Sequence, residues 1–198
     1  MFASRTTTSL LDALRDNSNE PAWAHIDARY RPVLTGMARR LGLGQSDAED
    51  VAQQALTEFV RAFRDGRYDR SKGRLSSWIL GIARNTTLKA MRARAREIPV
   101  GSTAVGDLPG KDEIRAIWEE QRDLVILTDA LGILRDDSAI DDRTLLAFEL
   151  VALRSVPAKE AARRCEMTVD QVYVARSRIT SRLRGLVERM TAAFEEDL

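Results

Sequence analysis

Charged residues of one sign gather in separate stretches of the chain, a pattern typical of proteins that bind a polyanion. Residues 70–96 contain eight Lys or Arg side chains and no Asp or Glu. Residues 107–142 reverse the balance with eleven acids and four bases, and residues 156–192 turn basic again with eight bases and four acids. Two separate basic stretches predict two surfaces for phosphate groups. Two solvated helix faces would explain the same composition.

The first basic stretch predicts a helix over residues 76–97 with distinct apolar and polar sides. Its core side would carry Trp78, Ile79, Ile82, Thr86 and Ala90. A narrow polar stripe lies beside this side within about 60° of the helix wheel and consists of Asn85, Lys89, Arg92 and Arg96. Solvated helices usually place acids among such bases. The absence of acids before Glu97 therefore favours phosphate contact.

The second basic stretch predicts two helices joined by a short turn over residues 157–178. Pro157 suits a first helical turn, the small Ala161, Ala162 and Cys165 allow close helix crossing, and Thr168 with Gln171 forms a capping box. A buried stripe would contain Val172, Ile179, Leu183, Leu186 and Met190, and the opposite side Asp170, Gln171, Tyr173, Val174, Ser177, Arg178 and Arg182. The pattern is that of a helix-turn-helix, although plain helical bundles show it too. Glu166 stands where such turns usually have Gly.

Acidic residues cluster at another predicted helix start. Ser46 would cap this helix and Glu49 would complete a capping box. Asp47, Glu49 and Asp50 are compatible with a metal site, but no His or fourth carboxylate follows at matching spacing. Acids at a helix N-terminus are stabilised by the helix dipole in any case, so we interpret this cluster as capping.

Motifs for enzymatic chemistry are missing. The run Gly42–Asp47 lacks the third glycine of a dinucleotide site, and Gly106–Asp112 has the wrong spacing for a phosphate loop. One cysteine, Cys165, and one histidine, His25, exclude a disulfide framework and a multi-thiolate zinc site. We therefore expect no catalytic residue, metal or cofactor.

Helical periodicity runs through most of the 198 residues, and no sustained polar–apolar alternation indicates a strand. Helices are expected at about 9–16, 21–41, 46–63, 76–97, 112–135, 141–153, 157–165 and 169–192. Pro99–Gly110 holds five Gly or Pro residues and predicts a flexible linker between two helical halves. The expected fold is therefore all-α, with two small helical domains. No apolar run suits a membrane span, and Met1–Thr8 lacks an apolar signal core, so we expect a cytoplasmic protein without membrane insertion.

Three segments resemble extracytoplasmic-function (ECF) sigma factors of bacterial RNA polymerase. Asp47-Ala-Glu-Asp-Val-Ala-Gln-Gln54 is similar to an acidic family signature, with Gln54 in place of Glu. Gly73-Arg-Leu-Ser-Ser-Trp-Ile-Leu-Gly-Ile-Ala-Arg-Asn85 is similar to a second motif, with Leu75 in place of Phe, and residues 161–178 resemble the family's helix-turn-helix. The resemblance implies a region-two-like domain at 8–97, a linker at 98–111 and a region-four-like domain at 112–192.

The resemblance also implies roles for named residues. Docking on core RNA polymerase would use Asp47, Glu49, Asp50 and Gln53. Recognition and melting of the promoter −10 element would use Arg74, Arg84, Asn85, Lys89, Arg92 and Arg96. Recognition of the −35 element would use Thr168, Asp170, Gln171, Tyr173, Val174, Ser177, Arg178 and Arg182. Implied partners are core RNA polymerase, promoter DNA and an anti-sigma protein or regulatory kinase.

Two details depart from the family pattern. Arg176 lies at the edge of the apolar stripe, where many relatives have Leu, so both burial and phosphate contact stay open for it. Tyr173 and Val174 replace more usual polar readers, which leaves the −35 sequence unpredicted.

Two other functions stay open on the residues alone. A helix-turn-helix regulator that never docks on polymerase would leave the acidic signature and the acid-free helix unexplained. A signalling adaptor that binds a protein through its acidic middle would have no affinity for DNA.

Overall fold

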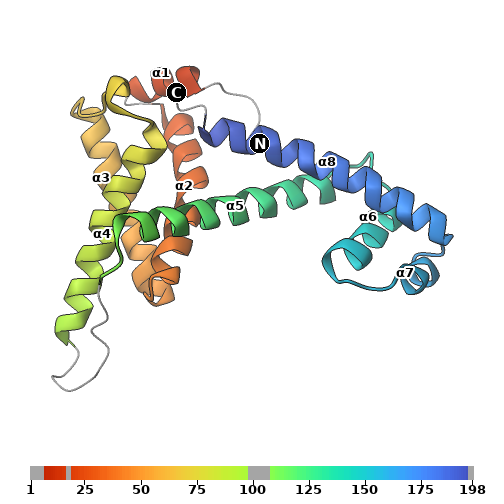
Figure 1. Cartoon of the computed structure of the whole chain (residues 1–198). Coiled ribbons are helices and arrows are strands. Elements are labelled where there is room, and N and C mark those ends of the chain that lie inside the picture. The colour runs from red at the N-terminus through yellow and green to blue at the C-terminus, as the bar shows by residue number, and fades with distance from the viewer. Residues whose placement is uncertain (1–6, 17–18, 98–107, 196–198) are drawn as a thin grey trace. The chain divides into compact units, whose positions relative to one another are not determined.

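The computed structural model describes residues 7–16, 19–97 and 108–195, and the regular structure within these ranges is entirely helical (Figure 1). This confirms the predicted all-α fold. Most of the predicted linker, residues 98–107, lies outside the described residues.

Contacts divide the chain into two compact units. The first comprises residues 1–125 and 193–198, and the second residues 126–192. One division falls inside α5 (Lys111–Arg135) and the other near the end of α8 (Val169–Glu195). The domain limits expected from the sequence stay a prediction.

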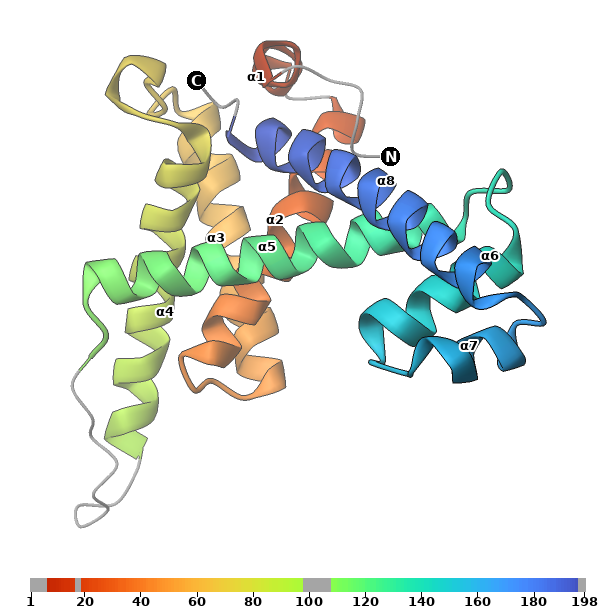
Figure 2. The ribbon, with the colours of Figure 1, turned by 45° about the vertical axis from the view of Figure 1, so that its right-hand side comes forward.

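In the first unit, α1 (Thr7–Arg15) contacts α2 (Glu20–Arg40), and α3 (Gln45–Arg64) packs against both α2 and α4 (Leu75–Glu97) (Figure 2). Every third or fourth residue of α3 is apolar, so one side of this helix is buried. Its buried alanines let the neighbouring helices approach, and Phe59 fills the space between α3 and α4. Gly42, with a φ of 92°, ends α2 in the left-handed conformation that glycine adopts easily.

The first unit also contains the beginning of α5 and Phe194. The rings of Tyr30 and Trp118 stack with centroids 6.1 Å apart, and the ring of Phe194 meets Tyr30 edge-on at 5.5 Å. Arg29 is buried beside them, with its guanidinium 4.6 Å from the Phe194 ring centroid. Its Nη2 donates to the carbonyl oxygen of Ala193 at 2.6 Å. This hydrogen bond satisfies one of the last carbonyls of α8.

The second unit contains two buried clusters, one made largely of small side chains and one of larger apolar residues around Phe148. It comprises part of α5, then α6 (Asp142–Phe148), the π-helix η2 (Glu149–Leu153), α7 (Ala158–Arg164) and most of α8. Buried Ala147, Ala161, Ala162, Cys165 and Ala175 form much of the first cluster. The single helix expected over residues 141–153 changes to π geometry after Phe148, because Arg154 N–H bonds to the carbonyl of Glu149, five residues back, at 3.0 Å.

Candidate functional site

The first turns of α3 present an exposed acidic edge. Asp47, Glu49, Asp50 and Gln53 are all exposed, whereas Ala48, Val51 and Ala52 are buried on the opposite side. The predicted Ser46 cap is wrong. The helix begins at Gln45 after an extended Gly44, whose carbonyl accepts from Ala48 N–H at 3.0 Å, so Ser46 lies inside the first turn. Glu49 accepts from the side chain of Gln45 instead of completing the box.

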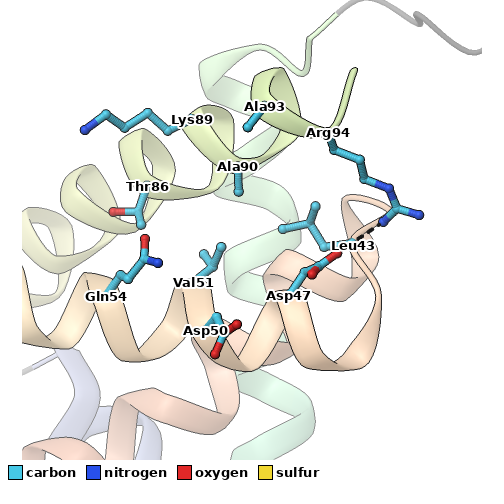
Figure 3. A pocket seen from close by; sticks show the side chains of 10 residues that line it. All are labelled: Leu43, Asp47, Asp50, Val51, Gln54, Thr86, Lys89, Ala90, Ala93 and Arg94. Carbon is cyan, nitrogen blue, oxygen red and sulfur yellow. Dashed lines mark ion pairs between the residues drawn. The ribbon is translucent and has the colours of Figure 1, made fainter. Parts of the chain in front are cut away.

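A groove of about 690 Å³ separates this acidic edge from the second half of α4 (Figure 3). Asp47, Asp50 and Gln54 line one wall, and Thr86, Lys89 and Arg94 line the other. An ion pair closes one end, with Arg94 Nη1 3.6 Å from Asp47 Oδ2. The same nitrogen donates weakly to the carbonyl of Gly42 at 3.4 Å. Acidic and basic side chains thus face each other across two adjacent helices.

The predicted polar stripe of α4 is exposed along its whole length. Asn85, Lys89, Arg92 and Arg96 all lie on the surface, as does Arg74 before the helix. Ile79, Ile82 and Thr86 are buried on the core side, as predicted, whereas Trp78 and Ala90 are half-buried. The Thr86 and Thr87 hydroxyls donate to the carbonyls of Ile82 and Ala83 at 3.0 and 2.8 Å. These bonds satisfy both buried hydroxyls.

Arg84 differs from the rest of the predicted −10 set. It is half-buried, and its Nε is buried without a hydrogen-bond partner in the structure. Arg84 also lines a hollow of about 460 Å³ with Asn85, Lys111 and Arg115. Because a buried N–H without an acceptor is unfavourable, Arg84 Nε is a candidate donor to an acceptor in this hollow.

An aromatic cluster supports the loop between α3 and α4, and sequence reasoning did not identify it. Tyr68 stacks between Phe63 and Trp78, with ring centroids 5.9 and 5.2 Å away. Phe59 meets Trp78 edge-on at 5.5 Å. The spacing of Phe59 and Phe63 by one helical turn, followed by Tyr68 and Trp78, was the available signal. These rings hold the start of α4, and with it Arg74, in one place.

A 3-10 turn, η1 (Arg70–Lys72), shapes the same loop. Asp69 caps it by accepting from Ser71 N–H at 2.9 Å and from the Ser71 hydroxyl at 2.7 Å. These two hydrogen bonds lower the pKa of Asp69. Through the same two hydrogen bonds Asp69 fixes the turn that exposes Arg70 and Lys72.

The second unit has the predicted helix–turn–helix arrangement in α7 and α8. The capping box is present: Gln171 N–H donates to the Thr168 hydroxyl at 3.1 Å, and Thr168 N–H donates to Gln171 Oε1 at 2.8 Å. Glu166 lies in the turn with a φ of 53°, a conformation that glycine adopts without strain. Cys165 is buried as a small core residue, and burial raises the pKa of its thiol.

The outer side of α8 exposes most of the predicted readers, which are Asp170, Gln171, Tyr173, Val174, Ser177 and Arg178. Thr168 is exposed at the cap, where its hydroxyl already accepts one hydrogen bond. Arg182 forms an ion pair with Asp137 of the same unit. Arg176 is exposed, which excludes burial, and phosphate contact by this residue stays a prediction.

One family of known proteins matches the segment that carries the acidic edge, the groove and α4. Residues 26–97 match the sigma-70 region 2 family. This segment is a sigma-70 region 2 domain. The acidic edge of α3, the aromatic loop and the basic stripe of α4 all lie inside the region 2 domain.

Two relatives extend the comparison. The ECF RNA polymerase sigma factor RpoE of Cereibacter sphaeroides is 31% identical over 85 residues, which are 42% of this chain and 45% of that protein. The ECF RNA polymerase sigma factor SigE of Mycolicibacterium smegmatis is 31% identical over 91 residues, which are 46% of this chain and 34% of that protein. The chain spans less than half the length of either relative. Together with the region 2 domain, these matches confirm the resemblance to ECF sigma factors.

No group of three or more His, Cys, Asp or Glu side chains in the described part of the chain is arranged to hold a metal ion. Among the helices that the structure describes, none has the length and apolar character needed to cross a bilayer.

Proposed function

We propose that this chain is an ECF-type sigma factor that binds core RNA polymerase and directs it to promoters. The observation that carries the proposal is the region 2 domain, whose exposed acidic edge and acid-free basic stripe lie on adjacent helices. A protein with these two surfaces can hold a basic protein partner on one side and nucleic acid on the other.

The acidic edge is the proposed docking surface for polymerase. Its four members, Asp47, Glu49, Asp50 and Gln53, are exposed on successive turns of one helix. Ala48, Val51 and Ala52 anchor the other side of the helix in the core, so the helix backbone holds these side chains in position for a partner. Such preorganised charges favour fast, salt-dependent association with a basic surface.

The basic stripe of α4 is the proposed surface for the −10 element. Lys89, Arg92 and Arg96 can follow a phosphate backbone, and the half-buried Arg84 lacks an acceptor for its Nε. The aromatic loop beside Arg74 is suited to capture an unstacked base. Binding the open strand would shift the duplex equilibrium towards melting without a catalytic step, so the protein would act by binding rather than as an enzyme.

The second unit is the proposed reader of the −35 element. Its capping box fixes the start of α8, and the exposed side of this helix carries Tyr173, Val174, Ser177 and Arg178. In helix-turn-helix proteins, residues at the start of the second helix reach base edges in the major groove. Within this proposal the protein acts in the cytoplasm, and an anti-sigma protein or a kinase would control it by masking one of these surfaces.

Transcription in vitro tests the whole proposal. Core polymerase with and without the chain is given fragmented bacterial genomic DNA, and the 5′ ends of the transcripts are mapped. We expect starts that depend on the chain and lie downstream of a shared two-part motif. If the transcription start sites are the same with and without the chain, and the chain alone binds DNA, the result would instead support a regulator that never docks on polymerase.

A further inference from the structure

The outer side of α8 exposes two apolar side chains at its start. Tyr173 is 51% exposed and Val174 is 56% exposed, although neighbouring Val172 and Ala175 are buried in the core of the second unit. We infer that Val174 recognises a thymine through its C5-methyl group in the major groove of the −35 element. This inference rests on the proposed function and adds the base that the helix reads.

Val174 contributes nothing evident to folding. More than half of its surface is exposed, and it lies outside the buried clusters of the second unit. Valine is also a weaker helix former than alanine, because its branched side chain is restricted in a helix. The same restriction holds its two methyl groups in a nearly fixed position, which favours a contact that requires a defined apolar surface.

The residues around Val174 identify the occupant as DNA. Arg176 and Arg178 are exposed on the same helix, and Arg178 lies one turn after Val174. An exposed apolar side chain one helical turn before the exposed Arg178 fits a groove whose walls are phosphates and whose floor presents base edges. Thymine is the base whose major-groove edge carries a methyl group, and apolar side chains contact this group.

Two of the polar candidates nearby already have partners. The Gln171 side-chain oxygen accepts from Thr168 N–H, and the Arg182 guanidinium pairs with Asp137. These contacts hold both side chains away from a full, bidentate base contact. Apolar contact by Val174 therefore accounts for a larger share of the sequence readout than in a helix with free polar readers.

The test removes the methyl group from the DNA. Holoenzyme made from core polymerase and the chain first selects DNA from a pool with a randomised −35 region. Each thymine of the selected element, on either strand, is then replaced singly by deoxyuridine, and competition binding is measured. Burial of one methyl group is worth about fourfold in affinity, so we expect a loss of about this size at one position.

Two variants of the chain complete the test. Val174→Ala should bind thymine and deoxyuridine equally at that position, whereas Leu153→Ala, which truncates an exposed apolar residue elsewhere in the unit, should behave like the unmodified chain. Insensitivity of the unmodified holoenzyme to every deoxyuridine, or full sensitivity in Val174→Ala, would overturn the inference while leaving −35 binding intact. A holoenzyme that selects no DNA would overturn both this inference and the proposed function.

Discussion

The groove between α3 and α4 and the outer side of α8 are both rich in exposed charge, but they differ in what the charge surrounds. In the groove, Asp47 and Arg94 have opposite signs and lie 3.6 Å apart. On α8, Arg176 and Arg178 accompany the exposed apolar Tyr173 and Val174. The first surface is suited to partners recognised by charge, and the second to a partner whose shape and methyl groups matter.

The cores beneath these two surfaces also differ, in the kinds of side chain that they bury. Phe59, Phe63, Tyr68 and Trp78 form a connected aromatic cluster beneath the loop of the region 2 domain. The second unit has one cluster made mainly of small side chains and another built around Leu134, Phe148 and Ile179, with Phe148 as its one aromatic ring. Aromatic side chains bury more area each, so we expect the region 2 domain to lose more stability per truncated side chain.

The largest expected effect comes from Phe59→Ala. Phe59 is fully buried, so its truncation should cost about 3–5 kcal/mol of unfolding free energy. All three tryptophans, Trp23, Trp78 and Trp118, lie in the first unit, so tryptophan fluorescence during urea unfolding reports on that unit. Phe148→Ala, which truncates a buried ring of the second unit, is the matched control and should leave this transition nearly unchanged. Equal shifts in both variants would contradict the division into two units.

Next in size is the loss of cations from α4. Lys89→Ala with Arg92→Ala should lower open-complex formation about tenfold, because two single-strand phosphate contacts disappear, and should reduce the salt slope of log K by about 1.4. Permanganate reactivity of unpaired thymines measures the open complex. Removing two exposed cations elsewhere in the region 2 domain, Arg39→Ala with Arg61→Ala, is the control. An unchanged open complex in the α4 variant would refute the assignment of this stripe to the −10 element.

A smaller, opposite effect is expected at Glu166. Its φ of 53° is strained for a residue with a side chain, so Glu166→Gly should stabilise the second unit by about 0.5–1 kcal/mol. Glu166→Ala keeps the backbone strain, because alanine also has a side chain, and should not stabilise the second unit to a comparable extent. The readout is the reactivity of Cys165, which is buried in this unit and becomes accessible when the unit opens. Faster thiol modification in Glu166→Gly would contradict the prediction.

The smallest effect concerns acid stability at α7. Hydrogen bonds from Arg164 and Arg163 lower the pKa of Glu160. A carboxyl group with a lowered pKa in the folded state stabilises the fold above its unfolded pKa of about 4.3, and this contribution is lost as the pH falls through the folded value. Glu160→Gln should therefore flatten the dependence of Cys165 protection on pH below about 4.3. If Cys165 protection in Glu160→Gln falls with pH as steeply as in the unmodified chain, carboxylates other than Glu160 cause the acid sensitivity of this unit.

The helices were largely predictable because their apolar residues repeat locally. The limits of α2, α4 and α8 differ from expectation by only a few residues, and the Thr168–Gln171 capping box is present. The start of α3 was missed because two rules competed. Ser46 is a good capping residue, but the extended Gly44 and its carbonyl bond to Ala48 start the helix earlier.

Features that depend on distant residues were not predictable from one sequence. The Arg182–Asp137 pair joins positions 45 residues apart, so nothing in the local pattern of α8 distinguishes Arg182 from its neighbours. The stacking of Tyr30 on Trp118 likewise brings α2 and α5 together through side chains that periodicity marks only as apolar. The exposure of Arg176 was decided by the orientation of α8, which the edge of an apolar stripe does not fix.

Binding to core RNA polymerase tests the central claim most directly. The affinity for bacterial core polymerase is measured for the unmodified chain and for two double variants. The α3 variant carries Asp47→Ala with Asp50→Ala. The control carries Asp112→Ala with Glu113→Ala, which removes two exposed acids from the first turn of α5. We expect tight binding that falls about tenfold or more in the α3 variant only. Absence of binding by the unmodified chain, or equal binding by all three proteins, would contradict the account.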